Sequence, residues 1–190
     1  AIEKGQPDFA AELCDQVLDF APGDRRAANL LAQALIVCAQ DKRSILSRIG
    51  SAPSVFAAKF QKLIRNADGE ASSMRRAFMR DPGGIDKGIL WASALERAGY
   101  AGASLGAYSA LAIVSGEAAR SAGDLAAAQG EIDLALENYE LALKANPRDT
   151  AAMRARKNLA AEQALKLKDY GAEASGLDTE AFRRAALGDE

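Results

Sequence analysis

The chain has 190 residues, of which 43 are alanine, only 15 are Val, Ile or Thr, and none is histidine. Alanine favours helices and β-branched residues favour strands, so this composition indicates an all-α protein and excludes a sheet-centred domain. The lack of histidine excludes Ser-His-Asp and Cys-His catalytic sites, and a net charge of −2 is not that of a dedicated nucleic-acid-binding protein.

Residues 1–24 are predicted to form only the second half of a helix pair, because a single amphipathic run ends at Pro22. Its large apolar residues recur every three or four positions and predict one buried face: Phe9, Leu13, Val17 and Phe20. Since the first helix of this pair is missing, we expect the chain to be part of a longer protein. We also expect an exposed apolar edge at Phe9, Val17 and Leu18, where the chain forms a homo-oligomer or its N-terminus is poorly ordered.

Residues 25–50 and 51–84 are predicted to form two further helix pairs, the first with a short second helix at about residues 42–49. In the second pair, Ala58 lies where the helices cross and Pro82 ends the unit. The segment 42–87 is mildly basic, and its cations are expected to point away from the apolar stripe: Lys59, Lys62, Arg65, Arg75, Arg76 and Arg80. An ordinary charged surface is the favoured interpretation of this segment.

Residues 85–115 and 116–149 are predicted to form the last two pairs, with tight interhelical turns at Gly99 and Gly130 and a final corner at Pro147. A terminal helix over 150–168 is expected to begin at Asp149 or Thr150. The remaining residues, 169–190, form a C-terminal tail with a short helix at about 179–186. Four aromatic residues at helical spacings are predicted to pack between helices: Trp91, Tyr100, Tyr108 and Tyr139.

This pattern resembles the tetratricopeptide repeat (TPR) family, as found in bacterial helical-repeat proteins, and its best match is the 34-residue unit 116–149. Gly123 and Ala135 match the small residues at which paired helices cross. Tyr139 and Ala142 match the positions that pack between repeats. The resemblance implies a right-handed α-solenoid of antiparallel helix pairs over residues 1–168, capped by the terminal helix. A non-repeating helical domain is the alternative.

The resemblance also implies a non-catalytic interaction module or scaffold, since TPR arrays bind peptides or partner proteins in a concave groove. The first helix of each pair lines that groove, which assigns to it these polar residues: Asn29, Gln33, Lys59, Lys62, Ser93, Arg97, Arg120, Asp124, Arg154 and Asn158. The set is modestly basic, so an acidic protein segment or a free carboxylate is the expected partner. The alternatives are a helical accessory domain of a larger enzyme, and weak binding of an acidic partner or nucleic acid through segment 42–87.

No catalytic, cofactor or metal site is predicted, because the carboxylates fall mostly on solvated helix faces and no phosphate-loop or calcium-loop motif occurs. Cys14 and Cys38 are predicted to be buried free thiols. Such thiols favour a reducing compartment such as the cytoplasm, while the expected truncation leaves the periplasm open. No apolar run is long enough to span a bilayer.

Overall fold

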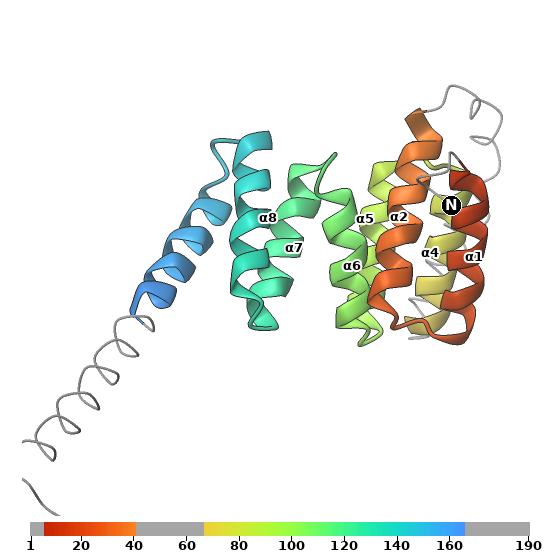
Figure 1. Cartoon of the computed structure of the whole chain (residues 1–190), viewed down its shortest axis with the longest axis horizontal. Helices are drawn as coiled ribbons and strands as arrows, with labels where there is room; N and C mark the ends of the chain where they lie inside the picture. Colours follow the sequence, from red (N-terminus) through yellow and green to blue (C-terminus); the bar gives the residue numbers. More distant parts are fainter. Residues whose placement is uncertain (1–5, 41–66, 166–190) are drawn as a thin grey trace, which may run out of the picture.

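The computed structural model describes residues 6–40 and 67–165, and these residues form eight helices and no strand, which confirms the all-α prediction. Seven helices are labelled in Figure 1: α1 (Pro7–Phe20), α2 (Arg25–Gln40), α4 (Ala67–Arg80), α5 (Ile85–Arg97), α6 (Ala101–Leu111), α7 (Gly116–Ala128) and α8 (Ile132–Ala145). Residues 150–165 form the eighth helix. The predictions for Ala58, Lys59, Lys62, Arg65 and residues 169–190 lie outside the described residues.

The helices end where proline and glycine punctuate the sequence. Pro22, Pro82 and Pro147 each lie in the turn that follows a helix, as predicted. Gly99 and Gly130 have φ angles of 86° and 76°, a backbone region that side chains with a Cβ atom rarely adopt. The last helix starts at an Asp149 cap, since the Asp149 carboxylate accepts hydrogen bonds from two backbone N–H groups of its first turn. These stops set the lengths of the hairpins.

The α7–α8 hairpin is held together at a glycine. A Cβ atom placed on Gly123 would lie 2.7 Å from the ring of Tyr139, so only glycine allows this approach. Tyr139 is 3% exposed, and Ala135 and Ala142 beside it on α8 are also buried. The close crossing that the sequence predicts at Gly123 is therefore confirmed.

Helix α6 packs against α2, α5 and α7, so neighbours surround it (Figure 1). Eight of its 11 residues are buried, and its apolar residues show no sidedness, as expected of a helix that is buried all round. The contact with α2 joins segments that are distant in the sequence. It is very close at Gly106, whose added Cβ atom would lie 2.2 Å from the carbonyl oxygen of Arg25. Asn29 of α2 also donates a hydrogen bond to the Gly106 carbonyl oxygen, at 2.9 Å.

The core of this N-terminal group of helices, α1, α2 and α4–α6, is built from a few large side chains among many alanines. Trp91 of α5 and Phe78 of α4 lie with ring centroids 6.3 Å apart, and both are almost fully buried. Leu18, Leu31 and Leu105 bring α1, α2 and α6 into the same core. Alanine fills the remaining contact positions, which lets the helices approach closely.

The prediction of the buried face of α1 is wrong. Its four large apolar residues are exposed: Phe9 by 53%, Leu13 by 44%, Val17 by 45% and Phe20 by 92%. The buried positions are the small ones next to them, Ala10, Ala11 and Cys14, together with Leu18. Leu18 is therefore not part of the exposed edge, whereas Phe9 and Val17 are. The close packing of α1 favours small side chains on its inner face.

An ion pair connects α2 to the residue that precedes α8. The guanidinium of Arg25, at the start of α2, donates to both carboxylate oxygens of Glu131, which immediately precedes α8. One of these bonds measures 2.8 Å. The two residues are 106 positions apart in the sequence. The pair therefore ties the N-terminal helices to the α7–α8 hairpin.

Candidate functional site

The polar residues predicted to line a concave groove are mostly engaged within the chain. Arg97 of α5 forms an ion pair with the buried Glu70 of α4 and donates a hydrogen bond to Ser93. Arg120 of α7 forms an ion pair with Asp149, at 3.3 Å, beside a hollow of about 340 Å³ between α7 and the end of α8. Two of the cations assigned to an acidic partner thus already have carboxylate partners in this chain.

The other predicted groove residues divide into packed and exposed ones. Asn29 and Gln33 are half-buried on α2, where Gln33 donates to Asn29 and Asn29 bonds to α6. Asp124 accepts a hydrogen bond of 2.8 Å from the hydroxyl of Tyr139. Arg154 and Asn158 are exposed on the helix of residues 150–165. Within the predicted set, the structure joins Asn29 to Gln33 and Arg97 to Ser93, while Arg120 and Asp124 bond to residues outside it.

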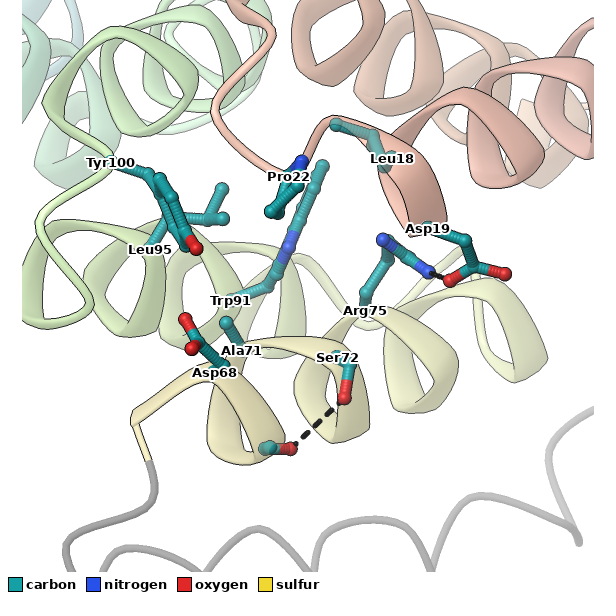
Figure 2. Close-up of a pocket in the computed structure, with 11 residues that line it drawn as sticks. Leu18, Asp19, Pro22, Asp68, Ala71, Ser72, Arg75, Trp91, Leu95 and Tyr100 are labelled. Carbon is teal, nitrogen blue, oxygen red and sulfur yellow. Dashed lines mark hydrogen bonds and ion pairs between the residues drawn. The ribbon is translucent and has the colours of Figure 1, made fainter.

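A different place gathers aromatic, apolar and charged groups from separate segments. It is a pocket of about 330 Å³ between α1, α4, α5 and the turn into α6, called here the Trp91 pocket (Figure 2). Its apolar lining comes from three helices and one turn: Leu18, Pro22, Ala71, Trp91 and Leu95. Its polar lining is Asp19, Asp68, Ser72, Arg75 and the hydroxyl of Tyr100. The lining is thus divided almost evenly between apolar and polar groups, a combination that can hold an amphipathic side chain.

Arg75 forms one wall of the Trp91 pocket and corrects the prediction of a solvated basic surface on α4. Its side chain is 5% exposed and lies between two carboxylates of α1, pairing with Asp15 through Nε at 2.6 Å and with Asp19 through a terminal nitrogen. Arg76 and Arg80, on the same helix, are exposed as predicted. A buried cation is stable only when it is paired, and here the acidic face of α1 supplies both partners.

Tyr100 and Asp68 form the opposite edge of the pocket, and Figure 2 shows their side chains directed toward each other. The hydrogen bond from the Tyr100 hydroxyl to Asp68, with burial and the negative charge of Asp68 as smaller causes, raises the pKa of Tyr100 above its usual value near 10. The phenol therefore stays protonated at neutral pH. Ser72 donates to the Gly69 carbonyl oxygen at 3.2 Å, which leaves lone pairs on the Ser72 oxygen.

The sequence singled out the two aromatic residues of this pocket but assigned them to packing. Trp91 is 1% exposed, so its core assignment is confirmed, and one part of its ring also lines the pocket. Asp19, Asp68 and Ser72 were not singled out. They lie on α1 and α4, which meet only in the folded chain, so local spacing carries no signal for them. The sequence gives only a partial indication of the pocket: Trp91, the single tryptophan, lies nine positions before Tyr100, which follows the predicted helix end at Gly99.

Cys14 and Cys38 do not form a disulfide with each other; Cys14 is buried as predicted, whereas Cys38 is half-buried and its thiol donates to Asp8 at 3.1 Å. Burial, and secondarily the charge of Asp24, raises the pKa of Cys14 above its ordinary value, so its thiol is protonated at neutral pH. Within residues 6–40 and 67–165, no group of three Cys, Asp or Glu side chains is arranged to hold a metal ion. No helix in this part of the chain has the length and apolar character needed to cross a membrane.

Comparison with known families gives no match: no family model matches the chain, and no curated protein matches its sequence.

Proposed function

We propose that this chain is a TPR-like, non-catalytic interaction module that holds one side chain of a partner protein in the Trp91 pocket. The TPR assignment rests on residues 116–149. There, Gly123, the turn residue Gly130 and Pro147 each occupy the position that the repeat pattern predicts, and Tyr139 packs on the glycine. In this proposal the hairpins α5–α6 and α7–α8 and the last helix form successive turns of a right-handed solenoid.

The single observation that carries the binding role is the composition of the Trp91 pocket. Its floor is apolar, so it gains free energy when a partner side chain displaces water from it. Its rim carries a carboxylate and two hydroxyl oxygens. Hydrogen bonds to these groups would fix the orientation of the bound side chain. The predicted groove cations Arg97 and Arg120 contribute less in this proposal, because each is neutralised by Glu70 or Asp149.

Site-specific photo-crosslinking in the cell that makes the protein tests this function. A photoreactive amino acid replaces Ser72, which is half-buried at the pocket rim, and in a control chain it replaces Glu137, which is exposed on α8. We expect one partner segment to be captured from position 72 and not from position 137. Equal capture from both positions, or capture from neither, contradicts a role for the pocket in partner binding.

A further inference from the structure

The charges around the Trp91 pocket favour one kind of guest. Among the described residues that line the pocket are two carboxylates, those of Asp19 and Asp68, and one guanidinium, that of Arg75, which also pairs with Asp15 outside the lining. Arg75 is already paired on two sides, so an anionic guest has to displace Asp19 and leave that carboxylate without its partner. A cationic guest displaces nothing and reduces the excess of negative charge. The electrostatics of the pocket therefore select a cation.

The polar groups at the rim of the pocket can still accept hydrogen bonds. The Asp68 carboxylate and the Tyr100 hydroxyl face each other across the rim (Figure 2), and a carboxylate has about four lone-pair sites that can accept hydrogen bonds. The Ser72 hydroxyl proton is committed to the Gly69 carbonyl oxygen and the Tyr100 hydroxyl is directed toward Asp68, so the lone pairs of both oxygens remain as acceptors. An ammonium group carries three donors and no acceptor, which makes it the chemical complement of this rim.

The remainder of the pocket suits an aliphatic stem. Leu18, Ala71 and Leu95 surround the edge of Trp91, and the ring of Tyr100 stands at the side (Figure 2). The methylene groups of a lysine side chain pack on such apolar surface while the charged end stays at the polar rim. A volume of about 330 Å³ is at the small end of ligand pockets, where the range is about 300–1,000 Å³, and is suited to one side chain.

We infer that the Trp91 pocket binds the side chain of a lysine in a partner protein segment, with the ammonium group at Asp68, Ser72 and Tyr100 and the methylene stem against Trp91. This inference rests on the proposed function and specifies the chemistry of its partner. Arginine carries the same positive charge but presents a wide, planar guanidinium, which matches a compact group of three acceptors less well than an ammonium does.

Because Trp91 is the single tryptophan of the chain, its fluorescence reports on this pocket alone. The full 190-residue chain is titrated with a blocked pentapeptide that carries one lysine among glycines, and with the same peptide carrying norleucine, glutamate or arginine. We expect saturable emission changes with the lysine peptide in the roughly millimolar range typical of a single side chain. The norleucine and glutamate peptides should bind at least about tenfold more weakly, since a hydrogen-bonded charge contributes about that factor.

Two variants test the position of the ammonium group. Asp68→Asn should weaken lysine-peptide binding about tenfold, whereas the exposed carboxylate variant Asp133→Asn on α8 should leave it unchanged. Both variants should keep the melting temperature of the parent chain, because both side chains are exposed. If the lysine and norleucine peptides bind equally well, or if Asp68→Asn binds the lysine peptide as the parent chain does, the inference that the pocket selects a cation is wrong. The proposed function, binding of a partner side chain in the pocket, would still stand. If no peptide changes the Trp91 emission, the inference and the proposed role of the pocket both fail.

Discussion

Arg25 and Glu131 form a two-pronged ion pair between the first residue of α2 and the residue that precedes α8. Each side chain is more than one third exposed, so solvent screens the pair and it contributes no more than about 1 kcal/mol to stability. Its value lies in geometry, because two parallel hydrogen bonds fix the direction of both side chains. The pair therefore sets where the α7–α8 hairpin stands against the N-terminal helices.

This pair predicts an acid-dependent loss of stability. The hydrogen bonds from Arg25, and secondarily its charge, lower the pKa of Glu131 below its ordinary value. Since the folded pKa is depressed, the stabilisation is present above the unfolded pKa of about 4.3 and is lost as the pH falls through the folded value. Glu131→Gln should lose up to about 1 kcal/mol of unfolding free energy at pH 7 and progressively less as the pH falls below about 4, measured by urea denaturation. Glu137→Gln, an exposed carboxylate of α8, should show no such difference.

The approach of α2 to α6 predicts opposite effects for two glycines of the same helix. Gly106→Ala should destabilise the protein by about 1–3 kcal/mol or more, because its Cβ atom would lie 2.2 Å from a backbone oxygen and the two helices would have to separate. Gly102→Ala meets no atom closer than 3.9 Å and should stabilise the protein by about 0.5–1 kcal/mol through reduced chain entropy. Chemical denaturation of both variants checks the pair. A similar stability change in both would show that α2 and α6 are not in close contact.

Tyr139 predicts a loss of stability at alkaline pH. Its burial, and secondarily its hydrogen bond to Asp124 and the charge of that residue, raise the pKa of its phenol well above the ordinary value. The folded state therefore holds this proton more tightly, so the stabilisation is complete below about pH 10 and declines as the pH rises above it. Tyr139→Phe should cost about 1 kcal/mol at pH 7 through the lost hydrogen bond and should reduce the decline above pH 10.

Asp124→Asn provides the matched comparison for Tyr139. This variant keeps a hydrogen-bond acceptor for Tyr139 but removes the negative charge. Because burial is the largest cause of the raised pKa of Tyr139, the variant should reduce the loss of stability above pH 10 only in part. Thermal unfolding followed by circular dichroism between about pH 8 and pH 11 measures both variants. A decline as steep in Tyr139→Phe as in the parent chain would contradict the assignment.

Arg75 and Arg76 are consecutive on α4, but only Arg75 is buried and paired, so their substitution should change the free energy of unfolding by different amounts. Arg75→Met leaves Asp15 and Asp19 without their partner and should cost about 2 kcal/mol, less than for a fully buried pair because both carboxylates are partly exposed. Arg76→Met changes an exposed side chain and should stay within about 0.5 kcal/mol of the parent. Urea denaturation decides the comparison. Equal effects would mean that the Arg75 ion pairs contribute nothing to the fold.

The positions at which helices end could be predicted from sequence because they depend on single residues. Pro22, Pro82 and Pro147 cannot continue a helix, and Gly99 and Gly130 supply a backbone conformation that other residues avoid. These effects act over one turn of chain. Each is visible without knowledge of the rest of the molecule.

The contact between α2 and α6 and the inner face of α1 could not be predicted in this way. In α1, a stripe of large apolar residues lies beside a stripe of small ones, and the hydrophobic pattern alone favours the large stripe. The fold buries the small stripe because its partners come close, and those partners are set by distant segments. The Trp91 pocket has the same origin, since its walls come from α1, α4 and α5.

The enclosure of α6 has a consequence for how the protein unfolds. An array in which each repeat contacts only its neighbours can fray one repeat at a time, and its terminal units can be deleted with a graded loss of stability. Here α2 packs against α6 although the two helices are about 60 residues apart in the sequence. Loss of the α1–α2 hairpin therefore exposes α6 to water. We expect the first helices and the middle of the chain to unfold in one cooperative transition rather than in separate steps.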